Sequence, residues 1–392
     1  MGKRKKIDKF ARRRLIFLMV IILIIIFFLI FSFKKKNNNY DDYRLIIGDE
    51  YINLKNDIFI DSFDNIYLSK QDIQDLYDSN IYYDSADNIL ITTFNKHIAK
   101  LELENKIVEL NGSNIELDST LIKLGDEIYL PFSEMEIVYD FEYTYSKETK
   151  TVIVDSISEE KSEASIIKKN AKIKEKIKLF SSNIEQVKKD DKLIIFEEIG
   201  NYYKVRTENG NIGYIKKSKL SDVNKIREKM DSTKIDELNF LEYTDISKDY
   251  SDMEINSKKK NAVKIDIFTI KGAQVNLKVD TKSKDYSFYK KWTEENNIMI
   301  VANLNCEDEV IDDFLTYNQR KFIIEDIYVK MVQNNLTVLN VDFNKINDLN
   351  SYYRFLIELS PKLREAGIKV IVTNSEKLNV EKLESIVDYI IK

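Results

Sequence analysis

Residues 263–392 alternate between apolar and amphipathic segments, and this alternation constrains the fold more than any other feature of the chain. Strands are predicted at 263–270, 275–279, 298–304, 336–343, 368–373 and 386–391. Between the later strands, apolar side chains recur at helical spacing, with Ile323, Ile327 and Met331 on one face and Leu356 and Leu363 on another. Strands that alternate with helices across short connections predict a parallel sheet, so we expect an α/β fold for this part.

Residues 336–344 are the most informative of these segments for function. They read Leu-Thr-Val-Leu-Asn-Val-Asp-Phe-Asn, a buried strand that leads into a helix. This segment resembles the fourth barrel strand of glycoside hydrolase family 18, the chitinase-like and spore-cortex-hydrolase-like enzymes, whose pattern is roughly Asp-Gly-x-Asn-x-Asp-Phe-Glu. Asn340, Asp342 and Phe343 match the pattern, but Asn344 stands where the family has its catalytic glutamate.

The resemblance implies a glycan site on this strand. In the family, the glutamate protonates the glycosidic oxygen, and the aspartate two residues earlier orients the acetamido group of the substrate, whose oxygen attacks the anomeric carbon. Residues i and i+2 of a strand face the same side, so we expect Asn340, Asp342 and Asn344 to point into one site. Asp388 and Tyr389 match an Asp-Tyr pair that contacts sugar in relatives, and they complete the set of glycan-binding candidates.

An amide in the acid position changes the expected chemistry. Asn344 accepts and donates hydrogen bonds but cannot protonate a leaving oxygen near neutral pH. We therefore predict a pseudoenzyme, a non-catalytic glycosidase-like domain that binds wall glycan or an envelope partner, with no catalytic residue. The alternative is an active N-acetylglucosaminidase or peptidoglycan (cortex) hydrolase whose acid comes from another strand, and a third interpretation is a scaffold without a glycan ligand.

The chain ends at Lys392, within or just after the last predicted strand. A complete barrel would need two more strand–helix units, so we expect residues 263–392 to form a truncated, partial TIM-type (β/α) barrel. Such an open sheet exposes two edges and an apolar face, and we expect a protein partner or the upstream domains to cover them.

Residues 44–155 contain an internal repeat with an offset of 62 residues. Ile66-Tyr-Leu recurs as Ile128-Tyr-Leu, and each copy continues with a short helix (70–77 and 132–138) and two strands. The turns at 84–88 and 146–150 are rich in residues that close hairpins. This double unit resembles the N-terminal domain of copper amine oxidases, which implies an α+β tandem-repeat stalk that lacks a redox centre.

The sequence pattern of residues 167–221 predicts a small β-barrel. The segment 201–215 reads as a strand, an Asn-Gly turn and a second strand. It resembles the closing hairpin of bacterial SH3 domains, which bind peptidoglycan peptides or act as spacers. Tyr202, Tyr203 and Tyr214 either line a ligand groove or pack the barrel. Residues 222–262 are polar and predict a linker with a helix at 223–230.

The N-terminus predicts a membrane anchor. Residues 15–33 are apolar apart from Ser32, and a helix of this length spans roughly 28 Å. Eight basic residues precede this segment and three follow it. This asymmetry predicts a basic cytoplasmic tail (1–14), an uncleaved single-pass anchor (15–33), and extracellular C-terminal domains on the cell membrane. A cleaved signal peptide is the competing interpretation, but the segment ends without an Ala-x-Ala-like site.

Composition excludes several partners. The first 36 residues hold 11 basic residues and 1 acidic residue, which leaves a net charge of −15 on the remaining 356. A charge of this sign argues against nucleic-acid binding. His97 is the single histidine, which excludes a multi-histidine metal site, and no phosphate loop or zinc spacing occurs. We therefore expect no metal and no cofactor in this multidomain chain.

Overall fold

The computed structural model describes residues 42–391, apart from 86, 179, 231–234, 236, 253–259, 273, 307–315, 344 and 345. The described residues from 44 to 391 belong to one compact unit. The predicted tail and anchor (1–33) and Asn344 lie outside the described residues. In the part of the chain that is described, no helix is both long and apolar enough to span a membrane.

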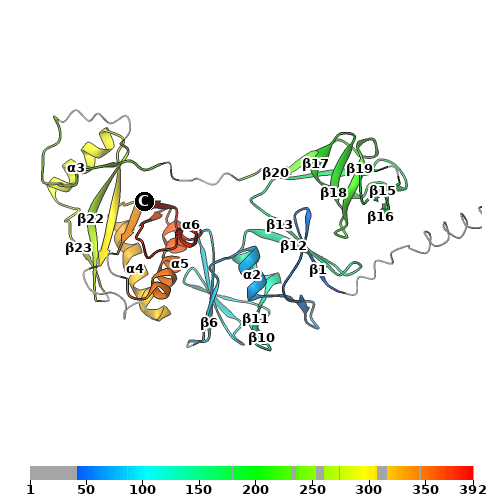
Figure 1. Cartoon of the computed structure of the whole chain (residues 1–392), viewed down its shortest axis with the longest axis horizontal. Helices are drawn as coiled ribbons and strands as arrows, with labels where there is room; N and C mark the ends of the chain where they lie inside the picture. Colours follow the sequence, from blue (N-terminus) through cyan, green and yellow to red (C-terminus); the bar gives the residue numbers. More distant parts are fainter. Residues whose placement is uncertain are drawn as a thin grey trace, which may run out of the picture. The chain divides into compact units, whose positions relative to one another are not determined.

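The repeat region folds into three antiparallel or mixed sheets (Figure 1). One sheet has the order β12 (Phe141–Ser146), β13 (Thr151–Ser156), β1 (Arg44–Ile47), β2 (Glu50–Ile52). The second has the order β10 (Ile122–Leu124), β11 (Glu127–Pro131), β4 (Ile66–Ser69), β3 (Phe59–Ile60). The third runs from β5 (Tyr82–Asp84) through β6 (Ile89–Phe94), β7 (His97–Glu102) and β8 (Ile107–Leu110) to β9 (Ser113–Glu116). We call residues 44–156 the repeat domain.

The two copies of the repeat meet at equivalent strands. β4 and β11 pair antiparallel, with Leu68 opposite Leu130, and both leucines are buried. The equivalent turn residues Asn88 and Lys150 both have positive φ, 54° and 50°. The helices differ, because α2 (Lys70–Leu76) is capped by the Ser69 side chain, whereas residues Phe132–Ile137 form a 3-10 helix without a side-chain cap. The predicted strand and helix positions of the repeat are therefore confirmed.

A separate seven-stranded sheet follows the repeat domain and extends beyond the predicted barrel boundaries of 167–221. Its order is β16 (Asn183–Val187), β15 (Ala171–Lys174), β19 (Ile212–Lys216), β18 (Tyr202–Arg206), β17 (Lys192–Ile199), β14 (Lys161–Ser165), β20 (Asn224–Arg227). The helix predicted at 223–230 is wrong, because Asn224–Arg227 pairs antiparallel with β14 and so satisfies the edge of that strand. We call residues 161–227 the small β-domain.

The C-terminal region is the expected α/β fold. Its sheet has the order β21 (Phe240–Leu241), β22 (Ala262–Lys271), β24 (Met299–Cys306), β25 (Val338–Asp342), β26 (Lys369–Thr373), β27 (Tyr389–Ile391), with all neighbours parallel. The helices are α3 (Lys284–Glu295), α4 (Tyr317–Gln333), α5 (Leu349–Glu365) and α6 (Val380–Glu384). We call residues 240–391 the α/β domain.

One predicted strand of this sheet has a different partner. β23 (Gln274–Leu277) pairs antiparallel with β22 and lies off the parallel path, so it does not add a parallel strand to the barrel wall. Gly272 in the intervening turn has a φ of +55°, which suits a tight reversal of the chain. A turn this short cannot carry the crossover that a parallel pair requires.

The two faces of the parallel sheet are covered differently. The helix side forms the main core, in which Leu304, Leu339 and Val370 pack with residues such as Ile323 and Phe355. We call the opposite face of the sheet the interior face. It carries an apolar layer, the lower layer, in which Ala262, Val301, Val338 and Ile371 pack with Leu238, Ile235 and Phe240. Part of the predicted 222–262 linker therefore covers the interior face instead of spanning between domains.

Helices α4 and α5 pack against the five-stranded sheet of the repeat domain. Arg320 of α4 is fully buried, and its Nε lies 2.7 Å from Glu358 Oε1 of α5. Tyr82 of β5 donates its hydroxyl to the same carboxylate oxygen. Ile89, Ile91 and Tyr317 form a buried apolar cluster at this contact. An upstream domain thus covers the helical side of the α/β domain.

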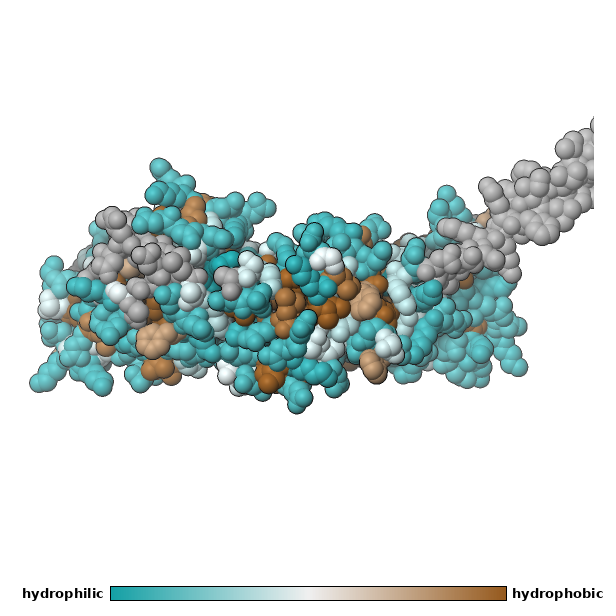
Figure 2. Space-filling model, turned by 90° about the horizontal axis from the view of Figure 1, so that it is seen from below, coloured by the Kyte–Doolittle hydropathy of each residue, from teal (hydrophilic) through white to brown (hydrophobic). Residues whose placement is uncertain are grey.

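Large apolar side chains also remain on the surface. The face drawn in Figure 2 is mostly hydrophilic, with apolar side chains gathered in its middle part. The most exposed include Phe180, Phe63, Phe288 and Phe322. They belong to different domains, and single exposed apolar residues are normal for folded proteins.

A glycine in the small β-domain gives a test of its packing. A Cβ on Gly213 would lie 2.5 Å from the carbonyl oxygen of Lys174, a backbone atom that cannot move away alone. We expect Gly213→Ala to lower the free energy of unfolding by about 1–3 kcal/mol through overpacking. Urea denaturation measures this loss, and Lys216→Ala on the exposed face of the same strand serves as the control. A stable Gly213→Ala variant would contradict the close packing of β15 and β19.

Candidate functional site

The interior face of the parallel sheet carries a row of polar side chains above its apolar layer. Four neighbouring strands supply them: Lys264 and Asp266 from β22, Asn303 and Asn305 from β24, Asn340 and Asp342 from β25, and Thr373 from β26. Successive members on one strand are two residues apart, so they share a face. This set, which we call the polar ladder, includes Asn340 and Asp342, two of the predicted glycan-binding candidates.

Two asparagines form the buried centre of the ladder. Asn340 is fully buried, and its Nδ2 donates to Asn303 Oδ1 at 2.6 Å and to Thr373 Oγ1 at 2.8 Å. Asn303 is 2 % exposed and donates to Asp266 Oδ1 at 2.6 Å and to Asn305 Oδ1 at 3.0 Å. Buried amides without partners would cost free energy, and here each amide group has at least one. The centre of the ladder is therefore held in one geometry.

An ion pair lies at the carboxyl end of β25. Lys264 Nζ lies 2.9 Å from Asp342 Oδ2, and the side chains are 34 % and 19 % exposed. Asp342 is the last residue of β25, so its carboxylate lies at the edge where sites of parallel α/β folds form. One oxygen of the Asp342 carboxylate is thus already bound to a lysine of the same chain.

The structure brings together some of the predicted site residues. Asn340 and Asp342 share the interior face with the polar ladder, and Tyr389 packs beside its apolar lower layer. Asn344 lies outside the described residues. The shared face of Asn340 and Asp342 agrees with the strand pattern that the sequence indicated.

Asp388 lies elsewhere. Its Oδ1 accepts a hydrogen bond from Arg364 Nε at 3.0 Å, and its Oδ2 accepts one from the Val370 N–H at 2.8 Å. Val370 is the second residue of β26, so Asp388 lies at the amino end of the strands, opposite the edge that carries Asp342. Its role is to join α5 to the sheet, and we remove it from the candidate glycan-binding residues.

Sequence reasoning missed most of the polar ladder. Lys264, Asp266, Asn303, Asn305 and Thr373 were not named as candidates, although a signal was present. Polar residues two positions apart interrupt otherwise apolar strands in both Lys264-Ile-Asp266 and Asn303-Leu-Asn305. That alternation predicts one polar and one apolar face, and the repeat of the pattern on adjacent strands would have indicated a site.

The three tyrosines of the small β-domain do not share one face. Tyr203 packs against the core of the domain, next to Val205. Tyr202 precedes it in β18 and so faces the opposite side, where Tyr214 lies across from Lys204. Lys204 itself pairs with Asp49 of the β1–β2 hairpin at 2.6 Å. The structure thus separates Tyr203 from the other two tyrosines, and ligand binding by Tyr202 and Tyr214 remains a prediction.

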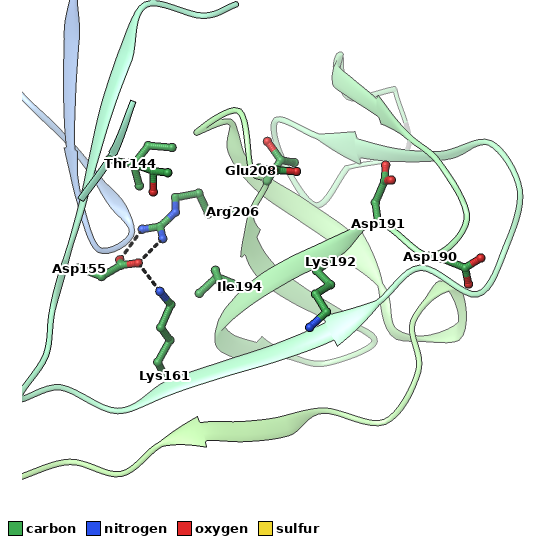
Figure 3. A pocket seen from close by; sticks show the side chains of 11 residues that line it. Thr144, Asp155, Lys161, Asp190, Asp191, Lys192, Ile194, Arg206 and Glu208 are labelled. Carbon is green, nitrogen blue, oxygen red and sulfur yellow. Dashed lines mark hydrogen bonds and ion pairs between the residues drawn. The ribbon is translucent and has the colours of Figure 1, made fainter. Parts of the chain in front are cut away.

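A pocket of about 480 Å³ lies between the repeat domain and the small β-domain (Figure 3). Arg206 binds Asp155 through both terminal nitrogens, at 2.7 and 2.6 Å, and Lys161 reaches the same carboxylate at 2.7 Å. These contacts hold the pKa of Asp155 below its usual range, although its burial acts in the opposite direction. Since both cations at this end of the pocket have carboxylate partners, we interpret the pocket as the joint between the two domains.

The polar ladder presents amide, hydroxyl and carboxylate groups, which can exchange hydrogen bonds with a polar ligand. Within the described ranges, no group of three His, Cys, Asp or Glu side chains could hold a metal ion.

Comparison with known proteins finds similar solved structures only. No family model matches the chain, and no curated protein matches it. A class V chitinase from Pseudomonas fluorescens is similar at 12 % identity and a TM-score of 0.30, over 33 % of this chain and 45 % of that chain. A chitinase from Chromobacterium violaceum is 17 % identical with a TM-score of 0.29, over 33 % and 47 %. A glycoside hydrolase family 18 chitinase from Flavobacterium johnsoniae is 17 % identical with a TM-score of 0.28, over 33 % and 45 %.

This chain therefore spans less than half the length of each of these chitinases. At these identities and TM-scores the likeness carries no argument about activity, and the residues of the interior face have to supply it.

The buried centre of the polar ladder gives a test of the site. We expect Asn340→Ala to lower the free energy of unfolding by at least about 2 kcal/mol, because it removes the donor to both Asn303 and Thr373 in a buried site. Asp266→Ala changes an exposed member of the same network, and we expect a loss under about 1 kcal/mol. Chemical denaturation of both variants measures the difference, and equal losses would contradict the described burial.

Proposed function

We propose that this chain is a non-catalytic envelope protein whose α/β domain binds an N-acetylated wall glycan through the polar ladder. The observation that carries the proposal is the combination of Asn344 at the acid position with Asp342 bound to Lys264. The first removes the proton donor that the related chemistry needs, and the second occupies one oxygen of the orienting carboxylate. What remains is a set of hydrogen-bonding groups on a rigid sheet.

Burial divides the ladder into two roles. Asn303 and Asn340 are buried, and their amide groups form hydrogen bonds with each other and with neighbouring side chains. Asp266 is exposed, and Asn305 and Asp342 are half-buried, so these three can reach a ligand. The buried pair thus holds the residues that would contact the glycan, which reduces the ordering cost of binding.

The remaining parts of the proposal concern location. Residues 15–33 would anchor the chain in the cell membrane, with the tail 1–14 inside and the three domains outside. The repeat domain and the small β-domain would then hold the polar ladder away from the bilayer, in reach of the wall. The resemblance of the small β-domain to bacterial SH3 domains supports a second contact with peptidoglycan through Tyr202 and Tyr214.

Retention on insoluble glycan tests the proposal. We expect the full chain to bind purified peptidoglycan or chitin, and Asp342→Ala to weaken this binding at least about tenfold through the loss of charge-assisted hydrogen bonds. Asp285→Ala, an exposed carboxylate in the first turn of α3, is the matched control and should bind as the unaltered chain does. If the unaltered chain is not retained, the scaffold interpretation replaces glycan binding.

Activity on the same glycans separates the alternative. We expect no clearing of peptidoglycan in a zymogram of the full chain. Clearing that disappears in Asp342→Ala would instead establish a hydrolase whose acid lies outside the position of Asn344.

A further inference from the structure

The carboxylate of Glu358 is a buried titratable group that the proposed glycan site does not use. Its side chain is 2 % exposed and lies where α5 meets α4 and the repeat domain. Oε1 accepts hydrogen bonds from Arg320 Nε and from the Tyr82 hydroxyl, whereas Oε2 has no hydrogen-bond partner among the described residues. A buried carboxylate oxygen that lacks a partner is costly when ionised, and protonation removes that cost.

A small cavity at the interface is lined by Glu358 and by residues of both domains. The cavity has a volume of about 30 Å³, and Glu358, Tyr317 and Asn111 are among its lining residues. This volume exceeds the roughly 10–15 Å³ that one water molecule requires. A water in the cavity would give Glu358 a route for proton exchange without separation of the domains.

Both domains contribute to the surroundings of Glu358. The cations are Arg320 and Lys321 of α4, Arg354 and Lys362 of α5, and Lys100 of β7. The acidic and phenolic groups are Glu325 and Tyr317 of α4, Tyr82 and Asp84 of β5, and Glu109 of β8.

These neighbours are already paired in the structure. Arg354 binds Asp84 at 2.8 Å and Lys362 binds Glu325 at 3.1 Å. Glu109 accepts from both Lys321 and Tyr317. Arg320 is therefore the cation that pairs with Glu358 itself.

We propose that the contact between the repeat domain and helices α4–α5 is a proton-responsive latch, closed most tightly when Glu358 is protonated. The closed form buries the carboxylate beside Tyr82, and separation of the two domains would return it to water. Protonation of Oε2 removes the buried negative charge and supplies an O–H donor on a residue that lines the cavity. The position of this single group on the interface couples its protonation to the docking of a whole domain.

The sign of the effect follows from the pKa of Glu358. Burial raises this pKa from 4.5 to about 7, against the opposing effects of Arg320 and the Tyr82 hydroxyl. The closed form thus binds the proton more tightly than an open form with an ordinary pKa. Closure is favoured below about pH 5, and the opening equilibrium constant rises roughly tenfold per pH unit between about 5 and 7.

Hydrogen exchange of the full chain between pH 5 and 8 tests the latch. After correction for intrinsic exchange rates, we expect amides of α5 and β6 to lose protection as the pH rises from 5 to 7. Glu358→Gln replaces the carboxylate by a neutral group of the same shape and should keep high protection across the range. Glu109→Gln, at the same interface, is the matched control and should keep the pH dependence of the unaltered chain.

A second measurement keeps the proposal testable if Glu358→Gln fails to fold. Carbon NMR of the full chain with labelled glutamate carboxyls should show one resonance with a midpoint near pH 7. Absence of any glutamate that titrates above pH 6, or equal pH dependence in Glu358→Gln and the unaltered chain, would overturn the latch.

Discussion

The contact of Tyr82 in the repeat domain with the buried pair of Arg320 and Glu358 in the α/β domain is the interaction on which the relation of the two domains depends. Both side chains have lost almost all contact with water, so their attraction does little more than offset the cost of removing two charges from solvent. We infer that the pair specifies the docking more than it stabilises it. Tyr82 of the repeat domain donates to the same carboxylate oxygen as Arg320, so a displaced repeat domain would leave the carboxylate with one donor fewer.

Helices α4 and α5 link this interdomain contact to the interior face of the sheet. α4 precedes β25 in the chain and α5 follows it, so the contact that fixes both helices also fixes the strand that carries Asn340 and Asp342. The apolar layer of the same face is covered by Leu238 and Phe240, which precede β22. The α/β domain is therefore a composite, in which an upstream domain covers the helices and the preceding segment covers the lower part of the sheet.

The sequence predicted those elements whose pattern is local. The strands β22, β24, β25 and β26 lie where apolar segments indicated them, and the 62-residue repeat placed β6 and β13 correctly. The predictions that were wrong concern which strands pair with each other. Nothing within residues 223–230 reveals that β14 will present an open edge, and nothing in 275–279 decides between a parallel and an antiparallel neighbour. Pairing depends on strands far away in the chain, which local periodicity does not contain.

The same distinction explains the outcome at the candidate site. Asn340 and Asp342 were identified because they lie two residues apart on one strand, whereas the bond between Asn303 and Asn340 joins residues 37 positions apart. The assignment of Asp388 failed because a matching dipeptide does not reveal at which end of a strand it lies. The contact of Tyr82 with Glu358 joins residues 276 positions apart and gives no signal in either segment. Polar side chains on apolar strands are thus visible in the sequence, but whether they face a ligand, a neighbouring strand or another domain is decided by tertiary packing.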